Sequence, residues 1–106
     1  PMAGAIFETA VLSELFKTLL HRGENPQIFF WRTTQGSEVD FVVEWRGLLV
    51  PIEVKLSGTP NPGMAKGIAA FREDLGDRAA HGYVVHPGTI TLPLAPGVTA
   101  IPFAAF

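Results

Sequence analysis

The segment from Glu38 to Lys55 constrains the fold more than any other part of the chain. Its sequence, EVDFVVEWRGLLVPIEVK, contains two runs rich in β-branched and aromatic residues on either side of Arg46-Gly47. This pattern predicts a β-hairpin with a two-residue turn. With that turn, Trp45 pairs with Leu48, and the register of all the other pairs is fixed.

The register brings charged side chains together near the open end of the hairpin. Asp40 is expected opposite Glu53, and Glu38 opposite Lys55. Because like charges directly opposed in a sheet are destabilising, the two carboxylates indicate a site that holds a cation. The alternative is an exposed strand face with a simple Lys-Glu pair. We interpret Glu38 as an ion-pair partner that orients Lys55 rather than as a ligand.

The rest of the chain supplies two helices and further strands. A helix is predicted from Gly4 to His21, with Leu12, Leu15 and Leu19 on its buried stripe and Glu8 in line with them. Gln27 to Arg32 is predicted to be a strand. The expected result is a meander of three antiparallel strands after the first helix.

A second helix is predicted to begin at Asn61-Pro62 and to stop at Gly76, with Met64, Ile68, Phe71 and Leu75 in the core. A short buried strand follows at residues 83–86, and residues 98–103 can add a last strand at the sheet edge, where Pro102 is tolerated. Pro51 indicates a bulge or an open edge in the third strand.

The predicted class is α/β, with a mixed sheet and the order α-β-β-β-α-β. The strand-helix-strand unit implies a parallel pair.

Composition limits the class of protein. With 106 residues, 47% of them hydrophobic, we expect residues 1–106 to form one domain with its own core. No apolar run reaches the ~20 residues that span a bilayer, so no membrane association is expected. The absence of cysteine favours a cytoplasmic setting. A net charge of −2 argues against strong autonomous binding to nucleic acid. Pro1 ahead of Met2 indicates a piece of a longer protein.

The carboxylates and the lysine define a candidate catalytic site. Asp40 and Glu53, with a main-chain carbonyl such as that of Val54, are suited to Mg²⁺ or Mn²⁺, because carboxylates without cysteine or clustered histidine favour these ions. Lys55 can then position or deprotonate a water, or stabilise charge on a phosphate oxygen. Glu8 is either a third acid of this site or a first-turn residue favoured by the helix dipole.

The remaining polar residues carry weaker signals. Arg32 and Arg46 can contact phosphates from the strand ends, although solubility is the simpler account of Arg46. The histidines share no ligand spacing and are expected on the surface or in loops: His21, His81 and His86.

The order of these residues resembles the PD-(D/E)XK nuclease superfamily, which has the restriction-endonuclease-like fold. The resemblance matches Glu8 to the acid on the first helix, Asp40 to the Asp of one strand, and Glu53 and Lys55 to Glu-X-Lys on the next. Val39 stands where the superfamily name has proline. Four segments are similar to a prokaryotic domain that lies C-terminal to AAA-type P-loop ATPase modules: residues 6–8, 31–32, 36–41 and 52–55. The chain itself contains no P-loop sequence.

The resemblance implies a Mg²⁺-dependent deoxyribonuclease, with DNA as substrate, an ATPase module in the same full-length chain, and a homodimer. The alternative is an inactive nuclease-fold module that binds nucleic acid or protein, which the acidic pI favours. In a third interpretation, an α+β interaction domain carries these carboxylates only as surface charge.

Overall fold

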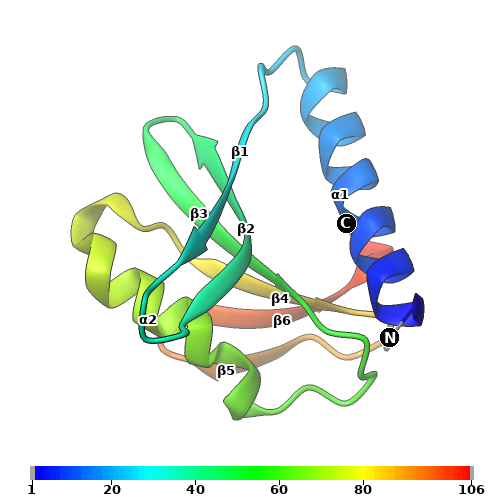
Figure 1. The fold of residues 1–106 in the computed structure, drawn as a ribbon. Helices are drawn as coiled ribbons and strands as arrows, with labels where there is room; N and C mark the ends of the chain where they lie inside the picture. Colours follow the sequence, from blue (N-terminus) through cyan, green and yellow to red (C-terminus); the bar gives the residue numbers. More distant parts are fainter. Residues whose placement is uncertain (1, 106) are drawn as a thin grey trace.

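The structure, a computed structural model, describes residues 2–105 (Figure 1). It contains two α-helices and six strands, with three short 3₁₀ helices between or after them. In chain order these elements are α1 (Met2–His21), β1 (Gln27–Arg32), β2 (Glu38–Trp45), β3 (Leu48–Val54), η1 (Pro62–Ala65), α2 (Lys66–Leu75), η2 (Gly76–Arg78), β4 (Gly82–His86), β5 (Leu92–Ala95), β6 (Val98–Pro102) and η3 (Phe103–Ala105).

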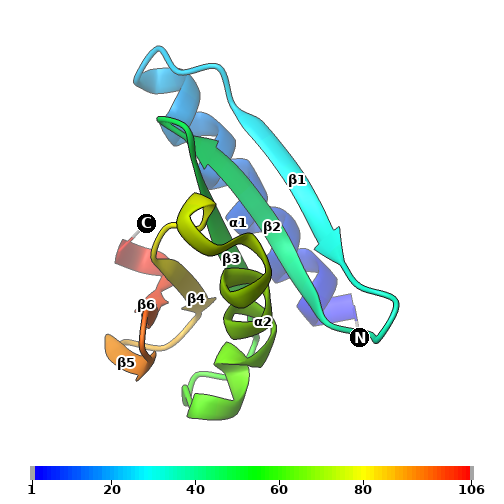
Figure 2. The same ribbon diagram turned by 90° about the vertical axis from the view of Figure 1, so that its left-hand side faces the viewer.

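The six strands form one mixed sheet in the order β1-β2-β3-β4-β6-β5. β1, β2 and β3 are antiparallel, β3, β4 and β6 are parallel, and β5 is antiparallel to β6. The two α-helices lie on opposite sides of the sheet (Figure 2). The predicted α/β class with a mixed sheet is therefore confirmed.

The last predicted strand is present, but its predicted position at the edge is wrong. β6 lies between β4 and β5, and Pro102 pairs with His86 of β4. The edge is formed by β5, which the sequence did not indicate because its four residues, LPLA, include a proline and follow a loop rich in proline and glycine. The chain turns back at Gly97, whose φ of 78° lies in the left-handed region.

The hairpin has the predicted turn and register. Arg46 and Gly47 have φ values of 51° and 84°, as a two-residue turn of the I′ type requires. The ladder runs from Trp45↔Leu48 to Phe41↔Ile52. The bulge or open edge expected at Pro51 is wrong, because Pro51 pairs with Val42 in a ladder without a register shift, and β2 and β4 flank its strand.

A bulge interrupts β2 at Asp40 and Phe41. On the β1 side, Phe29 pairs with Val42 and Trp31 pairs with Val39, so two residues of β2 lie opposite the single residue between them in β1. The bulge changes the alternation of side chains along β2. Val39 and Val42 consequently both belong to the core layer that packs against α2.

Each face of the sheet has its own apolar layer. The α2 layer includes the predicted Ile68 and Phe71, with Met64 and Leu75 packed against it. The α1 layer includes Leu19, and the other members of the predicted stripe pack at its margin. Val11 of α1 is completely buried although it was not part of that stripe. Within residues 2–105, no helix has the combination of length and hydropathy needed to cross a bilayer.

His86 is completely buried at the end of β4, so the expectation that it lies on the surface is wrong. Its Nδ1 accepts a hydrogen bond from the Gly88 N–H at 3.0 Å. Nε2 therefore carries the proton and donates to the Ile90 carbonyl at 2.7 Å. The imidazole thus supports the loop between β4 and β5. His21 and His81 are exposed, as expected.

Candidate active site

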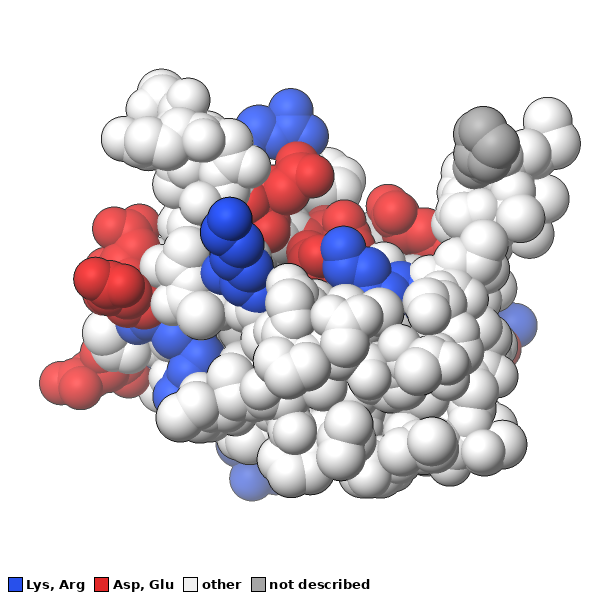
Figure 3. Space-filling model, turned by 90° about the horizontal axis from the view of Figure 1, so that it is seen from below, with Lys and Arg blue, Asp and Glu red and all other residues white. Residues whose placement is uncertain are grey.

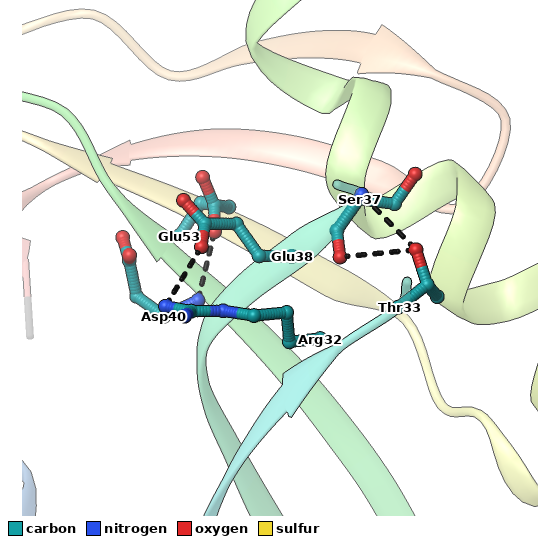
Figure 4. Close-up of polar contacts among 6 residues, drawn as sticks. All are labelled: Arg32, Thr33, Ser37, Glu38, Asp40 and Glu53. Carbon is teal, nitrogen blue, oxygen red and sulfur yellow. Dashed lines mark hydrogen bonds and ion pairs between the residues drawn. The ribbon is translucent and has the colours of Figure 1, made fainter. Parts of the chain in front are cut away.

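Two hydrogen bonds join Asp40 to Glu53 and Val54 just beyond the end of the β2–β3 ladder. The Asp40 N–H donates to Glu53 Oε1 at 2.8 Å, and the Val54 N–H donates to Asp40 Oδ2 at 2.8 Å. Figure 4 shows the first of these bonds. The two acids are therefore hydrogen-bonded neighbours, but side chain–backbone bonds replace the regular pairing that the register predicted, and the two carboxylates line different cavities.

The lysine lies beside the same pair of acids. Lys55 Nζ is 3.5 Å from Glu53 Oε2. The expected ion pair between Glu38 and Lys55 is wrong, because Glu38 Oε2 instead contacts Arg32 Nη2 at 3.2 Å, across the β1–β2 ladder (Figure 4). The amine of Lys55, just after β3, is thus held by the buried acid Glu53 of that strand.

The three acids affect one another's protonation. Burial, and then the charge of Asp40, raise the pKa of Glu53 from 4.5 to about 7. Burial also raises the pKa of Asp40, although the Val54 N–H and Lys55 oppose this shift. The pKa of Glu8 is raised by burial and then by the carboxylates of Asp40 and Glu38. Such a group of mutually repelling carboxylates is typical of a functional site.

Two cavities open next to these residues. One has a volume of about 340 Å³ and is lined by Glu53, Lys55, Glu38, the β1–β2 turn and the start of α2. The other, of about 500 Å³, is lined by Glu8 and Asp40, together with Phe30, Trp31, Arg32, Glu38 and Val39. Glu38 lines both cavities. Seen from below, acidic side chains lie in a depression of this surface with basic side chains beside them (Figure 3).

The bulge explains why the acids face different cavities. Glu53 lies between Ile52 and Val54, which both pack in the α1 layer, so its own side chain is on the α2 face. Asp40, at the bulge, lines the cavity that Glu8 of α1 also lines.

The carboxylate oxygens of this site are ligands of the type that a divalent ion prefers, but few protein side chains are placed to bind one. In the part of the chain that the structure describes, no group of three or more His, Cys, Asp or Glu side chains is placed to hold a metal. Asp40 and Glu53 supply carboxylate oxygens, and Asp40 Oδ2 already lies next to the backbone of Val54. A hard ion such as Mg²⁺ fits this set, because it retains several waters and uses one or two protein carboxylates. The Val54 carbonyl stays a predicted ligand.

Glu8 lies in the body of α1, since the helix begins at Met2 and its first turn contains no acid. The interpretation of Glu8 as a first-turn residue favoured by the helix dipole is therefore wrong. Its cavity also contains Arg32 and Asp40.

Arg46 is not brought to the acids. It lies at the hairpin turn with its guanidinium 5.3 Å from the centre of the Trp45 ring. It is six positions along the chain from Asp40, about 20 Å at roughly 3.3 Å per residue. Of the two predicted phosphate-contacting arginines, only Arg32 lines a cavity of the candidate site.

The sequence analysis missed two residues that line the cavities. Lys66, at the start of α2, lies in the wall of the Glu53–Lys55 cavity, and Phe30 lies in the wall of the Asp40 cavity. The alternation of Ile28, Phe30 and Arg32 along β1 was a usable signal for Phe30. No sequence signal placed Lys66, because the approach of α2 to β2 is a tertiary contact.

Comparison with protein families gives one match over nearly the whole chain. Residues 3–106 match the family described as "Domain of unknown function (DUF4143)". The chain belongs to this family. DUF4143 is thus the classification that the comparison provides, and it leaves the chemistry of the site open.

Two mycobacterial proteins contain a region similar to this chain. "Uncharacterized protein Rv2008c" of Mycobacterium tuberculosis and "Uncharacterized protein Mb2031c" of Mycobacterium bovis are each 33% identical to the chain over 102 residues. The alignment covers 96% of this chain but 21% of each relative, so the chain spans about a fifth of their length. No solved structure matches the chain.

Proposed function

We propose that this DUF4143 domain is a Mg²⁺-dependent phosphodiesterase of the PD-(D/E)XK type that acts on DNA. The observation that carries the proposal is the pair of hydrogen bonds that joins Asp40 to Glu53 and Val54, with Lys55 next to Glu53. This arrangement matches the residue types, the order and the adjacent strands that the resemblance implies.

The electrostatics of the acids support a cation at this place. Glu53 is 6% exposed, and the negative charge of Asp40 adds to the cost of its ionisation. Because Lys55 is partly exposed and offers one charge to two acids, it compensates them only in part. A bound divalent ion would supply the missing positive charge and would polarise a phosphate or a water.

The chain's own residues then have distinct roles. Asp40, Glu53 and the Val54 carbonyl would hold the ion, and Glu8 of α1, which lines the same cavity as Asp40, would add negative charge beside it. The Lys55 ammonium, next to Glu53 Oε2, orients the attacking water or stabilises negative charge on the phosphate. Arg32 contacts a phosphate at the margin of the site.

A second candidate is an inactive nuclease-fold module that binds nucleic acid or protein. Two observations favour it. Within residues 2–105, no third ligand joins Asp40 and Glu53. In addition, Glu53 Oε1 is already an acceptor for the Asp40 N–H. In this case the two acids mainly hold β2 and β3 together at their open ends.

Thermal melting in the presence of Mg²⁺ or Mn²⁺ separates these candidates. A metal that binds only the native state raises the melting temperature, and we expect the rise to disappear in Asp40→Asn and Glu53→Gln. Glu44→Gln is the matched control, because Glu44 is an exposed acid of the same β2 strand with a distant partner, Arg78 at 4.0 Å.

Nuclease activity is then measured on the same proteins with linear and circular DNA. Cleavage that requires the metal and is lost in Lys55→Ala supports the phosphodiesterase. A metal response without cleavage supports the inactive module. The absence of any metal response would contradict the metal site and leave the carboxylates as surface charge.

The proposal extends to the protein of which this domain is part. We propose that an AAA-type ATPase module precedes it, that the protein is cytoplasmic, and that two copies associate to cut two strands. The relatives, of which the domain spans 21%, have room for such a module. A P-loop in the full-length gene product and a dimer in sedimentation are the expected results.

A further inference from the structure

Phe30 is unusually exposed for an aromatic residue in a strand. It is 81% exposed, more than any other large hydrophobic side chain within residues 2–105. It belongs to β1, which is an edge strand of the sheet. Its ring packs against the buried Phe41, and the two ring centres are 6.5 Å apart.

The alternation of β1 places Phe30 on the same face as Asp40 and Glu8, whereas Glu53 lies on the α2 face. Ile28 packs in the α1 layer, whereas Trp31 packs edge-on against Phe71 of α2. Phe30 and Arg32 therefore share the α1 face of the strand. Phe30 is the residue that lies opposite the bulge at Asp40 and Phe41, and it lines the cavity that contains Glu8 and Asp40.

Arg32 provides a positive charge two residues further along this face. Its side chain is 78% exposed, and its ion pair with Glu38 is also exposed. Exposed pairs of this kind contribute little and exchange easily with another anion. An aromatic face, a guanidinium and the candidate metal ligands thus line one cavity of about 500 Å³. That volume is within the usual range for small-molecule sites.

We propose that Phe30 stacks on an unpaired nucleobase while Arg32 binds a phosphate of the same strand. The preferred substrate of the site is therefore single-stranded DNA or a frayed duplex end. In a duplex, both faces of each base are covered by its neighbours, so Phe30 can stack only on a base that has left the helix. This inference rests on the proposed function, because it assigns the substrate of the same site.

The surroundings of Phe30 favour nucleic acid over a protein partner. Apolar surfaces that bind proteins are usually contiguous. Phe30 borders an apolar cavity with Phe29 and Trp31 on the α2 side, but its cavity on the α1 side is lined by four ionisable side chains: Glu8, Arg32, Glu38 and Asp40. An exposed ring next to a guanidinium is a combination found in sites that bind single strands, where stacking tolerates any sequence.

Fluorescence anisotropy with the 106-residue chain tests the proposal. The probes are a labelled short oligothymidylate and a labelled DNA hairpin duplex, at low salt with EDTA, so that cleavage does not contribute. We expect the single strand to bind more tightly than the duplex. Phe30→Ala should weaken its binding about tenfold, as typical stacking energies imply, and Phe30→Trp should retain it.

Phe29→Ala is the matched control. Phe29 is 47% exposed on the same strand and shares with Phe30 the cavity beside α2, but it does not line the cavity that contains Arg32 and Asp40. Its substitution should leave the affinity unchanged. Because both phenylalanines are exposed, the variants should melt close to the unmodified chain. A strand that carries 2-aminopurine should be quenched on binding, and Phe30→Ala should abolish this quenching.

Three results would overturn the proposal: equal effects of the two alanine substitutions, unchanged affinity in Phe30→Ala, or tighter binding of the duplex. A dimer in sedimentation that only Phe30→Ala dissociates would assign the ring to a protein interface instead. Because EDTA is present, Phe30-dependent binding can be observed even if Mg²⁺ supports no cleavage. Failure of the stacking proposal is therefore distinguishable from failure of the proposed function.

Discussion

Glu53 combines burial with two polar contacts, and its ionisation should govern how stability depends on pH. The unfolded chain releases this proton near pH 4.5, whereas the folded chain retains it up to about pH 7. Between these values the native state binds more protons than the unfolded state. Stability should therefore fall as the pH rises through this window. The raised pKa values of Asp40 and Glu8 act in the same direction.

Glu53→Gln should remove most of this dependence in the absence of divalent ions. The amide oxygen of glutamine can still accept the Asp40 N–H, so the bond to β2 is retained. We expect the variant to be more stable at pH 8 by about 2–3 kcal/mol, and little changed at pH 4. Urea unfolding at both values measures this difference. Equal stabilisation at the two pH values would contradict an ionisation effect.

At the residue scale, the sequence identified the acids and the lysine but not all their partners. Asp40, Glu53 and Lys55 could be placed because the two-residue turn at Arg46-Gly47 determines the hairpin register. The ion-pair partner of Glu38 could not be predicted, since it depends on how β1 packs beside β2. The burial of His86 was missed for a similar reason, because its hydrogen-bond partners belong to the loop before β5.

At the scale of elements, the contact between α2 and β2 is the tightest near the site. A Cβ atom at Gly67 would lie 2.2 Å from the Glu38 carbonyl oxygen. This glycine lets the start of α2 approach the strand closely enough to form the wall of the Glu53–Lys55 cavity. A glycine within a helix has a cost, so its presence here has a packing reason.

Gly67→Ala should destabilise the protein by about 1–3 kcal/mol, because backbone must move to admit the methyl group. Gly4→Ala is the control, since Gly4 lies in α1 with nothing within 4 Å of its added Cβ. This control should stabilise the protein by about 0.5–1 kcal/mol through helix propensity alone. Chemical denaturation measures both. Similar stabilisation by the two substitutions would show that α2 does not need this close approach.

Most elements could be predicted because their periodicity is regular and their ends carry glycine, proline or asparagine. β5 and the bulge in β2 could not be predicted from the sequence. β5 is held by its pairing with β6 rather than by its own sequence. The bulge is visible only from the register with β1, because EVDFVVEW contains hydrophobic residues on both faces and so hides a shift in alternation.

At the scale of the whole molecule, the C-terminal strands complete a core that the first half of the chain begins. β6 pairs with β4, and Leu94, Val98 and Ala100 belong to the same apolar layer as Ile68 and Phe71. The domain should therefore fold as one cooperative unit.

A chain that ends at residue 87 tests this view. Without β5 and β6, the edge of β4 and its apolar layer would be exposed, and we expect circular dichroism and NMR to show an unfolded chain. A control that ends at residue 102 lacks η3, and with it the packing of Phe103 on the α1 layer and against Phe7, whose ring centre is 5.5 Å from that of Phe103. The control should fold and melt at a lower temperature. A folded shorter chain would contradict the shared core.

The extra residue at the β2 bulge affects which amino-acid substitutions this domain can accept. Because Val39 and Val42 occupy one apolar layer on either side of the irregularity, the packing continues as if the strand were unbroken. The carboxylate between them, that of Asp40, lines a cavity and takes no part in that packing. Sequence variation at the open end of the hairpin can therefore alter the candidate site while the interior stays intact.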